Sequence, residues 1–577
     1  MIMENPQTKI WQVYPALPSE IGEELKEFAP LLRQLLFNRG IISAEDARSY
    51  LQAKTARSTD PFLLKGMPAA VERVWAAVDN QEPIAIYGDY DVDGVTSTVL
   101  LVEFLTAAGA QVCPYIPNRF EEGYGVNSEA LTSLSQEGVR LVITVDCGVR
   151  SPVEVDAARA LGLDVIITDH HAPAPDRKLP AAAAVINQRQ VGDTYPDKDL
   201  AGVGLAFKLA QALLQVRPTP GLRAEDWLDL VALGTVADMA PLTGENRQLV
   251  AMGLELIHAS RRQGLTSLAA VAGISDMGKI GTYEIGFQLA PRLNAAGRLE
   301  SALDAFHLLT ERRPEETGLL AQKLDAQNTE RQSITRQIQE DASRLAFAEQ
   351  QDPLILFAFD AGFNEGVIGL AAARLVESYY RPAVVGSRKD GVVRASCRSI
   401  PEFHITEALD ECKDLLVRHG GHKVAAGLTV TNENLPELVA RLQAIAARQL
   451  QGAALRPVLQ ADYELDLKWL DGLPRVTRLM ALIAQLQPVG FGNPGAAFIS
   501  RGLKVSSCRT VGRDRSHLKL SVTNDGVTMD AIAFRQGHWA AQMPAKVDLF
   551  YTLEWNEFND TKKPQMNVRD IRPSETA

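Results

Sequence analysis

The sequence lacks the features that would place the protein in a membrane or outside the cell. No run of about 18 apolar residues occurs in it, so no membrane-spanning helix is expected. The N-terminal stretch MIMENPQTKIWQVYP has no basic segment followed by an apolar one, unlike a secretory signal. The five cysteines are scattered and form no CxxC pair, which excludes a disulfide framework and favours a reducing compartment. We therefore expect a cytoplasmic protein with no membrane partner.

The sequence also lacks an excess of positive charge. Its 59 Lys and Arg residues stand against 71 Asp and Glu residues, a formal net charge of -12. This balance argues against a protein that coats nucleic acid, but not against a nucleic-acid enzyme, because the local field at a site matters more than the sum. Hydrophobic residues make up 46% of the 577 positions, enough for several domains with true cores.

Repeats and low-complexity segments are absent, and the chain divides instead by changes in pattern. Residues 1–60 favour a helical N-terminal segment. Residues 61–312 alternate short β-rich runs with helical ones, which is typical of βαβ units and a parallel sheet. Residues 313–350, mostly free of proline and glycine, predict a long connecting helix. A second α/β domain is expected over 351–452 and a β-rich domain over 453–577.

Three carboxylates follow the strand-like run PIAIY at alternate positions: Asp89, Asp91 and Asp93 in GDYDVDG. Alternate side chains of an extended chain share a face, so these carboxylates converge and repel one another unless cations neutralise them. A calcium loop is excluded for two reasons. Its twelfth position requires a bidentate glutamate and is Leu100 here, and a strand-like run rather than a helix precedes it.

Two more strand-like runs end in residues of the same kind. VITVD ends in Asp146, and VIITDHH ends in Asp169, His170 and His171. One aspartate after a strand is usually a turn or cap, but sites in parallel sheets form where several strands end, so the joint pattern predicts a metal site. Asp238, within the mostly apolar LVALGTVADMAPL, is a further contributor. Oxygen and imidazole donors without sulfur favour Mn²⁺ or Mg²⁺, with two ions sharing a bridging aspartate.

The motifs GDYDVDG, VDCG, TDHH and GTVADMAPL, in this order, resemble the four motifs of the DHH phosphoesterase superfamily. RASCRS and GGHKVAAG resemble its DHH-associated domain, and the tail resembles an OB-fold. Over nearly the whole chain, the pattern is similar to the single-strand-specific 5′→3′ DNA exonucleases of that superfamily. The resemblance implies an α/β fold with a parallel-sheet DHH domain, a long connecting helix, a second α/β DHH-associated domain and a C-terminal β-rich OB-fold.

The resemblance also implies a site with two ions, Mn²⁺ or Mg²⁺, that releases 5′ mononucleotides without a covalent enzyme intermediate. His171 would contact the scissile phosphate or lie just beyond the ligands. Some superfamily members carry a histidine where this sequence has Tyr87, so Asp89 must supply that ligand here. The implied ligands are Asp89 and Asp91 for one ion, Asp93, His170 and Asp238 for the other, and Asp146 as the bridge.

Removal of nucleotides from a 5′ end requires a stop that recognises the terminal phosphate. Arginine suits this role because its guanidinium group binds phosphate oxygens in pairs. For each arginine, the alternative is a solvated surface charge. The HGGH stretch, which ends in His422, offers backbone N–H groups to a phosphate, and its alternative is a simple glycine turn. Residues 501–519 hold six basic residues against one acidic residue and predict strand binding by the tail. The candidate phosphate-binding residues are Arg119, Arg298, Arg394, Ser396, Arg398 and His422.

The resemblance further implies a monomer that acts on single-stranded DNA in recombination and repair, with a helicase and a single-strand-binding protein as partners. One alternative is a superfamily hydrolase of short oligonucleotides, cyclic dinucleotides or pyrophosphate. Such relatives generally lack the β-rich tail and the long helix. Another alternative is a catalytically inactive replication scaffold, which should have lost some of the metal ligands.

Overall fold

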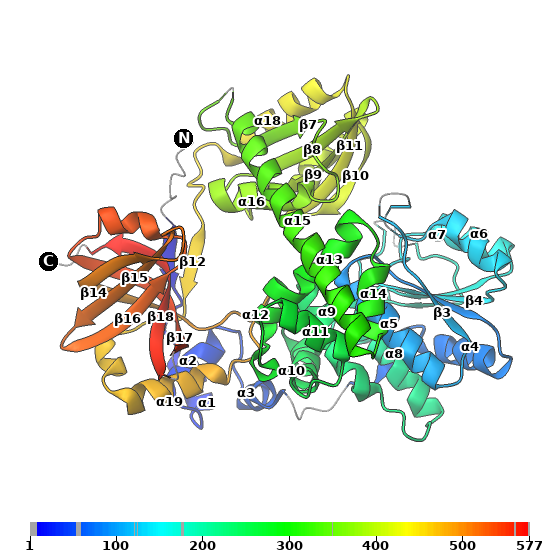
Figure 1. The fold of residues 1–577 in the computed structure, drawn as a ribbon, viewed down its shortest axis with the longest axis horizontal. Helices are drawn as coiled ribbons and strands as arrows, with labels where there is room; N and C mark the ends of the chain where they lie inside the picture. Colours follow the sequence, from blue (N-terminus) through cyan, green and yellow to red (C-terminus); the bar gives the residue numbers. More distant parts are fainter. Residues whose placement is uncertain are drawn as a thin grey trace. The chain divides into compact units, whose positions relative to one another are not determined.

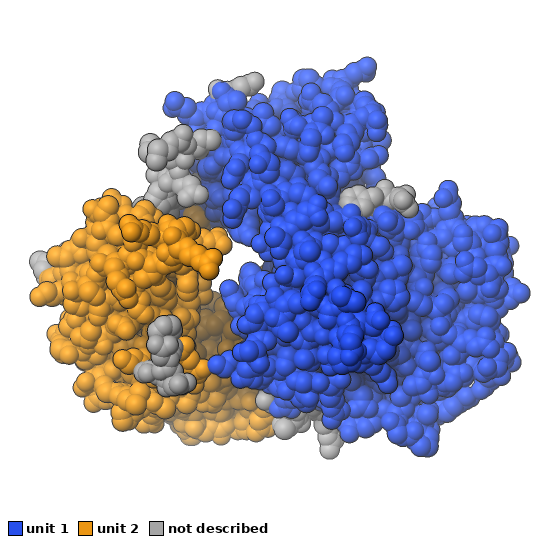
Figure 2. All heavy atoms as spheres, viewed as in Figure 1, with its two compact units in different colours: residues 1–7, 59–240, 252–456 blue, residues 8–58, 241–251, 457–577 orange. Residues whose placement is uncertain are grey.

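The computed structural model describes residues 9–53, 59–119, 122–123, 125–174, 178–348, 350–558 and 561–574. It divides into two compact units, shown as a ribbon in Figure 1 and in blue and orange in Figure 2. Unit 1 contains residues 59–240 and 252–456, and unit 2 contains residues 8–58, 241–251 and 457–577. The N-terminal residues therefore belong with the C-terminal domain, a difference from the separate helical segment predicted over 1–60.

A five-stranded parallel sheet organises the first part of unit 1, in the order β3-β2-β4-β5-β6. Two of its strands, β3 and β4, are labelled in Figure 1. Its central strands are apolar and buried along their whole length, as strands covered by helices on both faces must be. The predicted parallel sheet is confirmed. The strands are β2 (Ile84–Tyr87), β3 (Val112–Tyr115), β4 (Leu141–Val145), β5 (Asp164–Thr168) and β6 (Ala184–Ile186).

Helices cover this sheet and continue beyond it. Helix α5 packs against α8 and α9, which brings three helix termini close to the carboxyl ends of the strands. The helices that concern the site are α5 (Val92–Ala107), α7 (Pro152–Ala160), α8 (Gly202–Val216), α9 (Leu228–Ala237), α13 (Ala290–Leu299) and α14 (Leu303–Thr310).

A helix of 33 residues, α15 (Pro314–Ala346), joins the two parts of unit 1. Proline at its first position and Glu315 and Glu316 in its first turn are favourable at a helix N-terminus. The helix contacts α11 (Gln263–Val271), α13 and α14. It also contacts α16 (Ile368–Tyr379) and β7 (Leu356–Asp360) of the following domain. It lies within the predicted 313–350 segment.

The second part of unit 1 is a mixed sheet in the order β10-β11-β9-β8-β7. Strands β7 and β8 are parallel and the remaining pairs are antiparallel. The elements are β7 (Leu356–Asp360), α16 (Ile368–Tyr379), β8 (Ala383–Lys389), β9 (Val392–Arg398), β10 (Leu416–His422), β11 (Ala425–Thr431) and α18 (Leu435–Leu450).

Unit 2 is built around a β-barrel that closes through pairing of β14 with β17. Strand β1 (Ile10–Val13) pairs in parallel with β12 (Val458–Ala461), and the Trp11 indole N–H donates to the Asp570 carboxylate at 2.7 Å. This pairing is why the N-terminal residues join the C-terminal domain. The barrel strands are β14 (Ala497–Val511), β15 (His517–Asn524), β16 (Val527–Ala533), β17 (Lys546–Phe558) and β18 (Thr561–Pro573).

Two predicted absences can be compared with the described residues. None of their helices is both long enough and apolar enough to cross a membrane. The five cysteines are all free thiols.

Candidate metal centre and adjoining cavities

The predicted ligands converge at the carboxyl edge of the parallel sheet. Asp89 and Asp91 follow β2, Asp146 follows β4, and His170 and His171 follow β5. Asp93 lies in the first turn of α5, and Asp238 ends α9 as its C-cap. Three sets of residues bring ligand atoms within 4.8 Å of one another: Asp89 with Asp91 and Asp146, Asp93 with His170 and Asp238, and Asp146 with His170 and His171.

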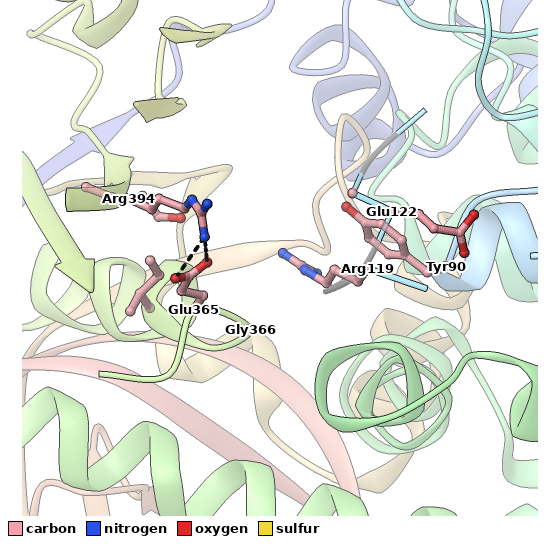
Figure 3. A pocket seen from close by; sticks show the side chains of 10 residues that line it. Tyr90, Arg119, Glu122, Glu365, Gly366 and Arg394 are labelled. Carbon is pink, nitrogen blue, oxygen red and sulfur yellow. Dashed lines mark hydrogen bonds and ion pairs between the residues drawn. The ribbon is translucent and has the colours of Figure 1, made fainter. Parts of the chain in front are cut away.

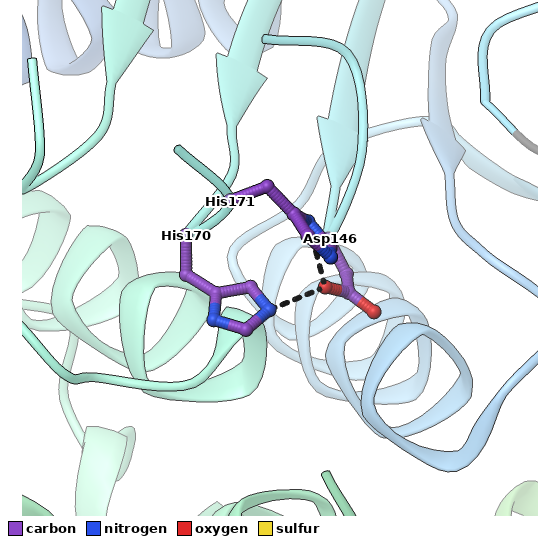
Figure 4. Close-up of side chains that lie close together, drawn as sticks. All are labelled: Asp146, His170 and His171. Atoms are coloured by element: carbon purple, nitrogen blue, oxygen red, sulfur yellow. Dashed lines mark ion pairs between the residues drawn. The ribbon is translucent and has the colours of Figure 1, made fainter. Parts of the chain in front are cut away.

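Asp146 lies at the middle of this arrangement. The Nε2 atom of His170 is 3.1 Å from Asp146 Oδ1, 3.8 Å from Asp238 Oδ2 and 3.9 Å from Asp93 Oδ2. Figure 4 shows both imidazole rings directed at the Asp146 carboxylate, with His171 Nδ1 3.8 Å from Oδ1. Asp146 therefore lies close to residues of both ligand groups.

Several ligand atoms in this centre have no hydrogen-bond partner within the described part of the chain, although two of them, Asp146 Oδ1 and His170 Nε2, lie 3.1 Å apart. Asp89 Oδ1, Asp146 Oδ1 and His170 Nε2 are buried and accept or donate no hydrogen bond there. A buried polar atom without a partner costs free energy, so such atoms need an explanation. Cations bound by these atoms supply it, and the oxygen-rich donor set with one or two imidazoles fits Mn²⁺ or Mg²⁺.

The carboxylates of the centre also repel one another. Burial, followed by the neighbouring charge of Asp91, raises the pKa of Asp89 well above its ordinary value and that of Asp93 to about 7. Burial and the charge of Asp93 raise the pKa of Asp146 strongly and that of Asp238 to about 8. Divalent cations would remove this penalty, since they stabilise the charged form of each carboxylate.

The backbone is shaped to bring Asp93 and Asp146 together. Asp146 has φ of 61°, a left-handed conformation that costs about 1–3 kcal/mol for a residue with a side chain. The first residues of α8 donate to the Asp93 carboxylate, Gly202 N–H at 2.7 Å and Val203 N–H at 2.8 Å. A Cβ atom on Gly202 would lie 2.8 Å from the Asp146 Cβ and 3.0 Å from Asp93 Oδ2. Glycine at this position allows both ligands to approach the helix.

The Asp169 carboxylate accepts hydrogen bonds from Val149 and His171 and does not face the other ligands. Its buried carboxylate accepts the Val149 N–H at 2.8 Å, the His171 N–H at 3.0 Å and the His171 ring Nδ1 at 2.8 Å. Burial disfavours the charged forms of both Asp169 and His171. The hydrogen bond between them outweighs burial, so the pKa of His171 is raised to about 9 and that of Asp169 is lowered. Asp169 therefore fixes the orientation of His171.

A cavity of about 430 Å³ adjoins the first metal motif and is lined by Tyr90, Arg119, Glu365, Arg394 and Ser396 (Figure 3). The Arg119 guanidinium lies over the Tyr90 ring, 4.9 Å from its centroid. Arg394 is exposed and pairs with Glu365 at 3.3 Å.

Two further predicted arginines lie beside this cavity. Arg298 donates to the carbonyl of Gly366, a lining residue, at 3.2 Å. A Cβ atom on Gly369 would lie 3.2 Å from Arg398 Nη2 and 3.3 Å from Ser396 Oγ, so both groups approach the start of α16. Burial, and then the charge of Arg119, lowers the pKa of Arg298 to about 10, and burial lowers that of Arg398. Partly buried arginines whose pKa values are lowered by burial and by a neighbouring arginine favour a bound anion.

His422 lies apart from those arginines. It lines a second cavity of about 700 Å³ together with Asp169, His171, Arg150 and the glycines of the β10–β11 hairpin. Burial lowers its pKa, and the charges of Arg150 and His171 lower it further. The six predicted phosphate-binding residues are thus divided between two cavities, five at the first and His422 at the second.

Comparison with known proteins agrees with this architecture. Residues 83–235 match the DHH family N-terminal domain, 351–448 match the DHHA1 domain, and 462–570 match the RecJ OB domain. The single-stranded-DNA-specific exonuclease RecJ of Bacillus subtilis is 40% identical over 557 residues, which cover 96% of this chain and 69% of that protein. The Escherichia coli protein of the same name is 33% identical, over 95% of this chain and 96% of its own. The chain belongs to the RecJ family.

A solved RecJ structure supports the same assignment. The crystal structure of RecJ from Thermus thermophilus in complex with Mn²⁺ matches 98% of this chain and 80% of its own, with 30% identity and a TM-score of 0.83. The same protein in complex with Mg²⁺ matches with a TM-score of 0.77. The fold predicted for a RecJ-like chain is therefore confirmed.

Sequence reasoning missed Asn187 of this RecJ-family site. This fully buried residue directly follows β6, and its side-chain N–H groups donate to the carbonyls of Asp169 at 2.5 Å and His171 at 2.8 Å. Its Oδ1 atom accepts the Arg189 N–H at 2.8 Å. Asn187 thus fixes the backbone that carries both histidines. The available signal was a polar residue at one more strand end, in AVINQ.

Proposed function

We propose that this RecJ-family protein is a single-stranded-DNA-specific exonuclease that works in the 5′→3′ direction and depends on two divalent cations, Mn²⁺ or Mg²⁺. One observation carries the proposal: six carboxylate and imidazole residues form two ligand groups that meet where His170 Nε2 lies 3.1 Å from Asp146 Oδ1, and buried ligand atoms there have no hydrogen-bond partner in the described residues. The complete ligand set argues against an inactive scaffold. The match to a RecJ OB domain argues against a hydrolase of short oligonucleotides or cyclic dinucleotides.

In the proposed site, Asp89 and Asp91 would hold one ion, Asp93, His170 and Asp238 would hold the other, and Asp146 would contribute to both. When bound, such ions activate water and stabilise the leaving oxygen of a phosphodiester. The chain contributes rigidity: α8 holds the Asp93 carboxylate, and Asp169 with Asn187 holds His171. The hydrogen bond with Asp169 raises the pKa of His171 to about 9. A protonated His171 is suited to donate a hydrogen bond to a phosphate oxygen.

We assign the terminal 5′ phosphate to the arginine-lined cavity. Arg119, Arg298, Ser396 and Arg398 supply cationic or hydroxyl donors beside the helix start of α16, which favours an anion. Tyr90, which lines this cavity, lies between the two metal ligands Asp89 and Asp91 in the chain. A terminal phosphate bound here would leave the next phosphate at the ions, which explains release of one nucleotide at a time. Arg394 would contact the strand from the rim, and His422 from the second cavity.

Several wider assignments rest on the family resemblance. We expect a monomer in the cytoplasm that acts in DNA recombination and repair. A helicase would supply single strands and a single-strand-binding protein would present them. The exposed basic stretch of residues 501–519 would bind the strand away from the metal centre.

The proposal is tested with single-stranded DNA labelled at its 3′ end, incubated with Mn²⁺, Mg²⁺ or chelator. The proposal is supported if single strands are shortened from the 5′ end, if chelator abolishes this shortening, and if duplex DNA is not shortened. Cleavage of dinucleotides but not of long strands would move the assignment to the short-oligonucleotide hydrolases. Inertness towards both, with two ions bound, would revive the scaffold.

A further inference from the structure

Glu365 is an acidic residue in a cavity that otherwise favours anions. Its carboxylate oxygens lie 3.4 and 3.3 Å from Arg394 Nη1. Figure 3 shows this pair facing Arg119 across the cavity. Glu365 is partly shielded, with 30% of its side chain exposed, whereas Arg394 is 61% exposed. The carboxylate therefore neutralises the outermost arginine of the cavity.

The other acidic lining residue that the structure describes is engaged elsewhere. Glu122 accepts the Tyr115 hydroxyl at 2.6 Å and the Asn118 N–H at 2.7 Å, and Figure 3 shows its carboxylate directed away from Arg119. Among the described lining residues, Glu365 is thus the acid that faces the arginines.

Size alone does not limit the cavity to one phosphate group. Its volume of about 430 Å³ is more than ten times the roughly 30 Å³ that a water molecule occupies in the liquid. Charge does limit it. A terminal monophosphate carries about -1.5 to -2, which two or three arginines balance. Additional phosphoryl groups would extend towards the rim, where Glu365 repels them and keeps Arg394 occupied.

We propose that Glu365 selects the chemical form of the 5′ end, by admitting a monophosphate and disfavouring a di- or triphosphate. The inference rests on the proposed phosphate site in this cavity and adds a charge limit to it. Glu365 acts in two ways at once: it repels the outer phosphoryl groups, and it neutralises the Arg394 guanidinium that would otherwise bind them.

The test compares three 3′-labelled single strands of the same sequence with a 5′ hydroxyl, a 5′ monophosphate or a 5′ triphosphate. Wild type is expected to cleave the monophosphate strand fastest. Glu365→Gln, nearly isosteric, is expected to raise the triphosphate-to-monophosphate rate ratio about tenfold. Glu365→Asp keeps the charge and should keep the wild-type ratio. Glu377→Gln, which removes an exposed charge from α16 outside the cavity, is the matched control and should also leave the ratio unchanged.

The outcomes separate the two claims. If wild type does not distinguish monophosphate from hydroxyl ends, the proposed phosphate site is wrong. If it does, but Glu365→Gln leaves the triphosphate ratio unchanged, only the role of Glu365 is wrong. An equal rise with Glu377→Gln would also overturn that role, because it would show a general effect of net charge.

Discussion

The metal centre and the arginine-lined cavity adjoin one another in unit 1, yet they are opposite in charge and in construction. The carboxylates of the metal centre are short side chains at strand ends and helix ends, and backbone N–H groups hold Asp93 and Asp169 in place. The arginines of the cavity are long side chains: Arg394 and Arg398 come from β9 and Arg298 from α13. Arg394 is exposed, whereas Arg298 and Arg398 are partly buried and each donates to a backbone carbonyl. Placement of ions requires rigid backbone, whereas recognition of a phosphate requires concentrated charge.

Each region also concentrates one sign of charge. Burial raises the pKa of Asp146 in the metal centre and lowers the pKa of Arg298 beside the cavity, so the first region favours cations and the second favours an anion. The comparison predicts that substitutions in the first region will abolish chemistry and ion binding together. Substitutions in the second region will change the choice of substrate end and leave ion binding intact.

The largest effect is expected for Asp146→Ala, which removes the ligand that we propose both ions share. Loss of both ions' electrostatic stabilisation should lower the cleavage rate at least about 10³-fold. Titration with Mn²⁺ should show fewer than two bound ions. The control is Asp156→Ala, an exposed aspartate on α7 away from the ligands, which should bind two ions and cleave normally. Full activity of Asp146→Ala would remove Asp146 from the centre.

Asn187→Ala should give the next largest effect, through the backbone and without loss of a ligand. Removal of the Asn187 side chain takes away the amide N–H groups that donate to the carbonyls of Asp169 and His171. Substitution of residues that hold metal ligands in place lowers metal affinity about 10- to 100-fold. Mn²⁺ titration and denaturant unfolding would measure both consequences. Asn432→Ala, at an exposed asparagine in the second domain, is the control. Unchanged Mn²⁺ affinity would show that the histidine turn holds its shape without Asn187.

Arg398→Ala should separate the two regions. Loss of a charged hydrogen bond to phosphate predicts about tenfold slower cleavage of strands with a 5′ phosphate, and little change for strands with a 5′ hydroxyl. Mn²⁺ titration should be as in wild type. Arg388→Ala, at an exposed arginine of β8, is the control. An equal loss on both strands would place Arg398 outside end recognition.

The smallest effect is expected in unit 2. Arg513 and Arg515 are exposed in the basic stretch of the barrel, so their joint replacement by alanine should weaken single-strand binding a few-fold. The slope of log affinity against log salt should become shallower by about 1.4, at about 0.7 for each phosphate contact on a single strand. An unchanged slope would show that this stretch does not touch the strand.

The sequence predicted which side chains cluster at the sheet edge because the relevant signals are local. Asp89, Asp146 and His170 each follow a short apolar run, and parallel strands bring such positions to one edge. The pairing of β1 with β12 could not be predicted, because nothing in a strand of four residues identifies a partner so distant in the chain. The roles of Asp169 and Asn187 depend on side-chain direction, and the pairing of Arg394 with Glu365 depends on rotamers, neither of which a residue pattern specifies.

The pairing of β1 with β12 also orders events during synthesis. Strand β1 begins at Ile10 and its partner begins at Val458, so about 450 residues must leave the ribosome before the partner exists. At about 5–20 residues per second, this delay lasts roughly 20 to 90 seconds. The N-terminal helices bury Leu25, Leu32, Leu35 and Leu36 in the barrel core, so these side chains have no final partner during that interval. The segments of unit 2 that precede unit 1 in the chain therefore reach their final packing only after all of unit 1 has been synthesised.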